Sequence, residues 1–204
     1  MARRKLKHFE EMKKWTHVLE PALGESGDLP GTWGKSVILE LGCGNGDYTL
    51  ELAARFPSKI VVGVDIKGSR LWHGAKKALQ SGLKNARFLR VRIEDLADFF
   101  AEAEIDEIWL PFPDPHPTKG NAKRRLTFPR FLEIYRRLLK PRGFLHLKTD
   151  NEALFRYTLG ILPGEGFEAV EVLWDSPPGE VQTLYEKKYL EEGRIIQYFC
   201  ACKV

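Results

Sequence analysis

The sequence has little cysteine and no long hydrophobic run. Its three cysteines, Cys43, Cys200 and Cys202, are too few and too irregularly spaced for a disulfide framework or a zinc site. No apolar run approaches the roughly 20 residues that a membrane-spanning helix needs. The basic start of the chain is followed at residues 9–14 by charged residues, where a signal peptide would be apolar. We therefore expect a cytoplasmic protein with no membrane span and no bound metal.

What is present is ordinary for a globular protein. The chain has 204 residues, of which 43% are hydrophobic and 29% charged, and this length suffices to bury one core. The net charge is +4, a mild basic excess that is compatible with a nucleic-acid partner but could equally be a solvated surface. The cations gather near the N-terminus and in one later segment: Arg3, Arg4, Lys5, Lys7, Lys13 and Lys14, and Lys119, Lys123, Arg124 and Arg125.

A segment rich in glycine, proline and serine at residues 26–35 indicates a linker before the first core strand. We therefore interpret residues 1–35 as a basic, partly helical N-terminal arm with its linker. Residues 36–204 are then one domain.

Beyond the linker, short apolar runs alternate with helical patterns. Strands are expected at residues 37–39, 60–64, 88–89, 108–110 and 144–147, and helices at 48–56, 68–79, 96–101, 128–139 and 152–162. Runs that are apolar throughout indicate a parallel sheet covered on both faces. Two last strands, 168–174 and 194–202, are expected to pair as an antiparallel edge with no helix between them. The sequence thus predicts an α/β fold with an open, mostly parallel seven-stranded sheet, helices on both faces and an antiparallel C-terminal edge.

The loop after the first core strand carries the clearest binding signal, because ligands of open α/β sheets bind beyond the carboxyl ends of the strands. Gly42, Gly44 and Gly46 let the backbone turn sharply and approach a ligand. A dinucleotide fingerprint would need its third glycine at the position of Asp47. Glu40 can attract the sulfonium and amino groups of S-adenosylmethionine, whereas it would repel a pyrophosphate. The pattern therefore favours a Rossmann-like class I methyltransferase over an ordinary glycine turn.

The ends of the next two strands support an adenosyl ligand. Asp65 follows the second strand, where a carboxylate can accept hydrogen bonds from both ribose hydroxyls, and Ile66 lies beside it. The structural alternative for Asp65 is a cap of the helix that follows. The third strand ends near Arg92, Ile93 and Glu94, from which adenine is usually contacted. These three could also be an exposed cation and the first residues of a helix.

The fourth strand runs into a rigid turn, Pro111-Phe112-Pro113-Asp114-Pro115. Such stiffness holds the Asp114 carboxylate in place beside the expected methyl donor, which favours a functional role over a structural turn. His116 follows in the same loop and is interpreted as a surface residue.

Four motifs occur in order: Phe112-Pro113-Asp114-Pro115, Lys123-Arg124-Arg125-Leu126, Leu147-Lys148-Thr149-Asp150 and Thr183-Leu184-Tyr185-Glu186. In this order they are specific, and the chain resembles the tRNA (guanine-N7-)-methyltransferase family from about Leu39 to its end. The resemblance implies methyl transfer from S-adenosylmethionine to a variable-loop guanine of tRNA. The sequence leaves both a monomer and a homodimer open.

The resemblance assigns roles to matching positions. Glu40 and Asp65 match the carboxylates that contact the donor, and Asp114 matches the catalytic aspartate. Substrate contacts fall on Thr118, Asp150, Thr183, Tyr185 and Glu186, with Lys119, Lys123, Arg124 and Arg125 expected at phosphates. The chain departs from the family pattern at His116, where tryptophan is usual, at Thr118, where lysine is usual, and at Arg92, where asparagine or aspartate is usual.

Several residues have structural alternatives. Thr149 and Asp150 could cap the helix that follows, and Thr183 to Glu186 could be a capping box at the start of a helix. Rival functions are a methyltransferase for another substrate, a non-catalytic RNA-binding protein with this fold and, less favoured by the glycine spacing, an NAD oxidoreductase.

Overall fold

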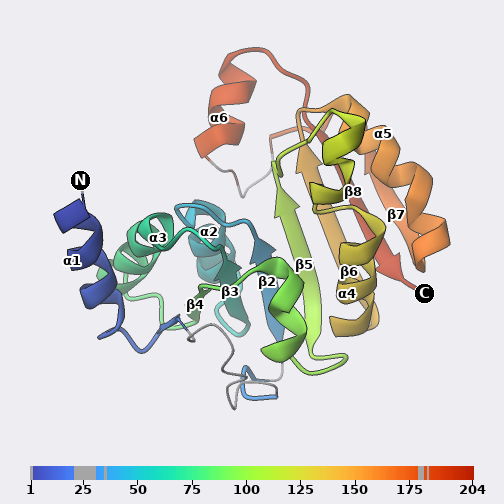
Figure 1. The fold of residues 1–204 in the computed structure, drawn as a ribbon. Coiled ribbons are helices and arrows are strands. Elements are labelled where there is room, and N and C mark those ends of the chain that lie inside the picture. The colour runs from blue at the N-terminus through green and yellow to red at the C-terminus, as the bar shows by residue number, and fades with distance from the viewer. Residues whose placement is uncertain (1, 21–30, 35, 179–181, 183) are drawn as a thin grey trace. The chain divides into compact units, whose positions relative to one another are not determined.

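The computed structural model confirms the α/β fold class (Figure 1). It describes residues 2–20, 31–34, 36–178, 182 and 184–204. The chain divides into two compact units, Met1–Ala101 and Glu102–Val204. The sequence predicts a different division, between an N-terminal arm of residues 1–35 and a domain of residues 36–204, and this division stays a prediction.

The described residues of the first unit form four parallel strands in the order β1-β4-β3-β2. These are β1 (Val18–Leu19), β2 (Val37–Leu41), β3 (Ile60–Val64) and β4 (Ala86–Leu89). In β2 and β3, runs of branched apolar residues pair in register from Val37 with Ile60 to Leu41 with Val64, and nearly all of them are buried. The three strands expected here are confirmed, and β1 is an additional one. As a result, the described residues form eight strands instead of seven.

The helices of the first unit are α1 (Ala2–Met12), α2 (Asp47–Arg55), α3 (Gly68–Gln80) and the 3-10 helix η1 (Ile93–Asp98). The helix expected at residues 96–101 thus begins and ends three residues earlier and is of the tighter type. α1 lies against α3 (Figure 1). Met12 is buried, the His8 ring stacks on Trp72 with centroids 3.8 Å apart, and Trp72 Nε1 donates to Glu11 Oε2 at 2.8 Å. The basic arm is therefore helical, as expected, and packs on the unit through aromatic contacts.

The second unit contains strands in the order β5-β6-β8-β7. These are β5 (Ile105–Pro111), β6 (Leu139–Thr149), β7 (Phe167–Leu173) and β8 (Gln197–Lys203). β5 and β6 are parallel, whereas β8 runs antiparallel to both β6 and β7. The predicted antiparallel C-terminal edge is confirmed.

In the described part of the second unit there are three α-helices: α4 (Pro129–Leu138), α5 (Glu152–Ile161) and α6 (Leu184–Glu191). Short 3-10 helices cover Lys119–Arg124 (η2) and Leu162–Glu165 (η3). α4 and α5 pack on the strands through buried side chains such as Tyr135 and Phe155. The expectation of no helix between the last two strands is wrong, because α6 lies there. Its eight residues have little amphipathic pattern, and a buried ion pair between Glu186 and Lys148 joins it to β6.

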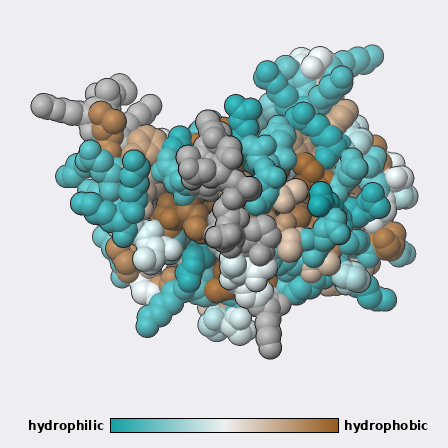
Figure 2. Space-filling view, turned by 60° about the horizontal axis from the view of Figure 1, so that its bottom comes forward, coloured by the Kyte–Doolittle hydropathy of each residue, from teal (hydrophilic) through white to brown (hydrophobic). Residues whose placement is uncertain are grey.

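Hydrophilic residues cover most of the surface seen in Figure 2, with hydrophobic residues in small groups between them. Among the described residues, no helix is both long and apolar enough to cross a membrane.

Candidate active site

The glycine loop, residues 42–46, joins β2 to α2. The backbone amides of Gly42 and Cys43 donate to the Val64 carbonyl at 2.8 and 3.0 Å, so the loop is fastened to the end of β3. Gly46 has φ of +73°, and a Cβ there would lie 2.6 Å from the Phe88 ring and 3.1 Å from the Gly74 Cα. The third glycine is therefore required both by backbone conformation and by close packing against α3.

Asp65 ties the glycine loop to the start of α3. Its Oδ2 accepts from the Gly44 amide at 2.9 Å and its Oδ1 from the Lys67 amide at 2.7 Å. The side chain is 9% exposed. An ionised carboxylate has about four acceptor sites, so these two bonds leave it able to accept from a ligand. Sequence reasoning placed a ligand contact at Asp65, with a helix cap as the structural alternative, but missed the bond to the Gly44 amide.

Glu40 is 2% exposed and accepts a hydrogen bond from the Thr49 hydroxyl of α2. Burial raises the pKa of the Glu40 carboxyl from 4.5 to about 8. Gly63 stands opposite Glu40 on β3, and a Cβ at Gly63 would lie 2.4 Å from Thr49 Oγ1. Sequence reasoning missed both Thr49 and Gly63. A glycine inside an apolar strand was the available signal, since it often marks a close approach.

The other predicted donor contacts lie on the surface. Ile66 is 49% exposed, and its carbonyl accepts from Arg90 Nε at 3.1 Å. Arg92 is exposed and precedes η1, Ile93 is half-buried, and Glu94 is exposed. Contact of these residues with adenine or ribose stays a prediction.

In the second unit, the turn that follows β5, residues 111–116, presents Asp114 to solvent. Phe112 and His116 have φ of +51° and +42°, a left-handed conformation that non-glycine residues rarely adopt. The Phe112 amide donates to the Lys148 carbonyl at 2.8 Å, and its ring meets Tyr189 of α6 edge-on, with centroids 5.6 Å apart. The predicted catalytic carboxylate therefore lies between two residues in strained conformations, Phe112 and His116. Long-range contacts hold Phe112 in place.

Glu186 does not lie open to a substrate. It is 1% exposed on α6, and its Oε1 pairs at 2.8 Å with the Lys148 ammonium of β6, which is 7% exposed. Sequence reasoning named Glu186 but missed Lys148. Tyr185 lies in α6, where only its backbone is described, and Thr183 lies outside the described residues.

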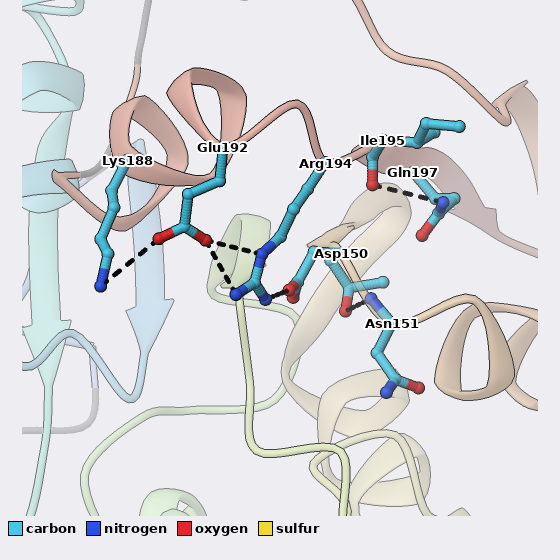
Figure 3. Close-up of polar contacts among 8 residues, drawn as sticks. Asp150, Asn151, Lys188, Glu192, Arg194, Ile195 and Gln197 are labelled. Atoms are coloured by element: carbon cyan, nitrogen blue, oxygen red, sulfur yellow. Dashed lines mark hydrogen bonds and ion pairs between the residues drawn. The ribbon is translucent and has the colours of Figure 1, made fainter.

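Asp150 follows β6 and belongs to a surface network (Figure 3). Arg194 Nη1 donates to Asp150 Oδ2 at 2.8 Å, and the same guanidinium bonds Glu192 and lies 4.4 Å from the Tyr189 ring centroid. The cap of α5 is Asn151, whose side chain accepts from the Leu154 amide at 2.9 Å. The alternative role of Asp150 as that cap is thus wrong, whereas Thr149 assists the cap by accepting from the Asn151 amide at 3.1 Å.

The basic segment Lys119–Arg124 forms η2, and Thr118 precedes it as an exposed residue. Lys119, Lys123 and Arg124 are exposed, while Arg125 is half-buried and bonds the backbone of the turn. In the part of the chain that the structure describes, no group of three or more His, Cys, Asp or Glu side chains is placed to hold a metal ion.

A glycine loop after β2, a carboxylate after β3 and a parallel sheet with an antiparallel end define the Rossmann-like class of methyltransferases. Residues 34–198 match the family described as "Putative methyltransferase". The chain belongs to the tRNA (guanine-N(7)-)-methyltransferase family. It is 43% identical to the protein of that name from Christiangramia forsetii, over 97% of this chain and 96% of the relative. The protein of that name from Bacteroides fragilis is 40% identical, over 97% of this chain and 85% of the relative.

The fold agrees with a solved methyltransferase. The structure of the 16S rRNA methyltransferase KamB superposes with a TM-score of 0.68 at 16% identity, covering 92% of this chain and 98% of that one. The methyltransferase class and family predicted from the sequence are confirmed by these similarities.

Proposed function

We propose that this chain transfers the methyl group of S-adenosylmethionine to N7 of a guanine in tRNA. The observation that carries the proposal is the similarity to tRNA (guanine-N(7)-)-methyltransferases over 97% of the chain. Two of the motifs that carry the resemblance, those containing Asp114 and Asp150, fall at the carboxyl ends of β5 and β6. The proposal places the reaction in the cytoplasm, because a reducing compartment keeps cysteines such as the three free ones here in the thiol form.

The donor would be held by the first unit. Glu40 is buried at the end of β2 and would face the positive amino and sulfonium groups, while Asp65 retains acceptor sites for ribose hydroxyls. A Cβ added at Gly44 would meet nothing within 4 Å, so the loop has open space through which a ligand can approach its backbone. These residues fit the donor. When bound, S-adenosylmethionine supplies an electrophilic methyl group.

The acceptor chemistry requires positioning more than proton transfer. Guanine N7 carries an in-plane lone pair and no proton, so a general base would add little. Alignment of reacting atoms can contribute on the order of 7 to 11 kcal/mol. The work of this chain is therefore to hold guanine in one orientation.

Asp114 is the residue proposed to orient guanine. Its carboxylate is exposed on a turn whose flanking residues are fixed, so it is available to accept from the N1 and N2 hydrogens of the base. The same negative charge favours the positive charge that develops on the ring after methylation. Asp150 would assist from the end of β6, held by Arg194.

Binding of tRNA would rest on phosphate contacts. Lys119, Lys123 and Arg124 are exposed on η2, and Lys7, Lys13 and Lys14 are exposed on or just after α1. Such contacts predict an affinity that falls with salt.

The direct test supplies methyl-labelled S-adenosylmethionine and unmodified tRNA, and locates the label by cleavage chemistry selective for 7-methylguanine. Asp114→Asn is expected to lower kcat about 100-fold, because the amide lacks the charge that orients the base. Donor affinity should stay unchanged. Asp175→Asn, the same change at an exposed carboxylate of the same unit, is the control. Label at another atom would refute the proposed reaction. Full turnover by the Asp114→Asn variant would refute the role of Asp114.

A further inference from the structure

We infer that Arg125 is a positioning residue that fixes the turn carrying Asp114, and that it is not a phosphate contact like its basic neighbours. The inference rests on the proposed function, because it concerns how that reaction's carboxylate is held. It also revises the sequence-based expectation, which grouped Arg125 with Lys123 and Arg124.

The guanidinium of Arg125 is committed to the protein. Nε donates to the carbonyls of Pro115 at 3.1 Å and His116 at 3.3 Å, and Nη2 donates to the His116 carbonyl at 3.2 Å. The same group lies 4.5 Å from the centroid of the Tyr157 ring of α5. Arg125 is half-buried, whereas Lys123 and Arg124 are exposed. One side chain of the cluster therefore faces the turn while the others face solvent.

The turn needs support at this end. His116 has φ of +42°, a conformation that is unfavourable for a non-glycine residue and persists only where the surrounding structure holds it. At the other end, Phe112 has φ of +51° and is held by its hydrogen bond to the Lys148 carbonyl. Arg125 is the matching support at His116. Asp114 lies midway between the two held residues.

The chemistry of the arginine suits this task. A planar guanidinium can bond two adjacent carbonyls in its own plane while its face stacks on an aromatic ring. A lysine keeps the charge but cannot do both. The backbone of Arg125 is itself fixed, since its amide donates to the Ala122 carbonyl at 3.1 Å and its carbonyl accepts from the Phe128 amide at 2.9 Å. The side chain therefore reaches the turn from a rigid base.

The test compares Arg125→Lys with Lys123→Ala and Arg124→Ala. Because a displacement of about 1 Å can cost 100-fold in rate, Arg125→Lys is expected to lower kcat roughly 10- to 100-fold. The KM for tRNA and the salt dependence of tRNA binding should change little. Lys123→Ala and Arg124→Ala should instead leave kcat nearly unchanged and raise the KM for tRNA. Each should also reduce the slope of log tRNA affinity against log salt concentration by about one.

Tyr157 supplies a matched pair of variants. Tyr157→Phe keeps the ring under the guanidinium and should keep kcat, while Tyr157→Leu should lower it in the same direction as Arg125→Lys, by less. Amide hydrogen exchange across residues 112–118, measured without tRNA, should be faster in Arg125→Lys than in the wild type.

An Arg125→Lys variant that keeps kcat would overturn the inference, because lysine retains the charge that a phosphate contact needs but not the planar group that holds the turn. Unchanged exchange in the turn would also overturn it. A wild-type protein that does not methylate N7 would instead sink the proposed function. The exchange measurement still tests the inference in that case, since it needs no turnover.

Discussion

Two loops of the molecule follow parallel strands and carry the proposed chemistry, yet they are held in different ways. The glycine loop after β2 is fixed by backbone hydrogen bonds to the adjacent strand end, by Asp65 and by close packing against α3. The turn that carries Asp114 is fixed by side chains and carbonyls from distant segments, namely Arg125, Lys148 and Tyr189. The first arrangement tolerates few local substitutions, and the second depends on remote partners.

The difference corresponds to what each loop must do. A donor common to many methyltransferases can be held by backbone groups, which any sequence supplies once glycines permit the path. A carboxylate that orients one base needs a defined direction, and that direction comes from packing around the turn. We therefore expect variants near the first loop to affect donor binding, and variants far from the second to affect kcat.

The largest effect is expected from Gly46→Ala. The new methyl group would lie 2.6 Å from the Phe88 ring and 3.1 Å from the Gly74 backbone, at a residue with φ of +73°. The loop must move, so donor affinity should fall by about 100-fold or more. Gly82→Ala, outside the loop, is the matched control, because φ is +67° there but a Cβ would meet nothing within 4 Å. It should lower the free energy of unfolding by roughly 1–2 kcal/mol and leave donor affinity near the wild-type value. Calorimetric titration with S-adenosylmethionine distinguishes them, and equal losses would contradict the packing argument.

The same contrast explains what sequence reasoning could reach. The strands β2 and β3 and the loop between β2 and α2 were predictable because apolar runs and glycine spacing are local signals. The predicted strand at residues 60–64 is confirmed with the same bounds, and that at 37–39 extends to Leu41. Donor-side residues could therefore be named from the pattern alone.

The acceptor side was less predictable because its partners are far apart in the chain. The Lys148–Glu186 pair joins residues 38 positions apart, and the Asp150–Arg194 bond spans 44. No periodicity marks such contacts, and α6 was missed because its eight residues show little amphipathic pattern. Basic residues of one cluster also look alike in sequence, although Arg125 faces the protein and Lys123 faces solvent.

The second largest effect should come from Lys148→Met. This change leaves a carboxylate that is 1% exposed without the ammonium that pairs with it, and breaking a buried pair in this way costs about 3–5 kcal/mol. Lys188→Met is the control, because its pair with Glu192 has side chains 66% and 38% exposed and should contribute about 0.5 kcal/mol or less. Urea unfolding, with amide exchange in α6, measures both. Similar losses of unfolding free energy in Lys148→Met and Lys188→Met would show that burial does not make the Lys148–Glu186 pair more important than an exposed pair.

The smallest effect, and the sharpest test of the donor loop, is the pH dependence caused by Glu40. Its pKa is about 8 in the folded chain and 4.5 ordinarily, so the folded state retains a proton that the unfolded chain releases between these values. The stability that Glu40 contributes is therefore present at low pH and falls as pH rises towards 8. A cationic donor prefers the ionised carboxylate. Donor affinity should thus rise with pH below about 8, by at most tenfold per pH unit for one proton released, and level off above it.

Calorimetric titration of S-adenosylmethionine in buffers of different ionisation enthalpy counts the protons released. The amino group of the donor titrates in the same region, at about 7.7 to 8.0 for an α-amino group, so Glu40→Gln is needed to measure the donor's own share. The difference between wild type and variant belongs to Glu40. Thr49→Val removes the hydroxyl bond that lowers the pKa of Glu40, and it should move the break in the affinity profile to higher pH. If wild type and Glu40→Gln released the same number of protons at pH 7, Glu40 would already be ionised, and burial would not control its charge.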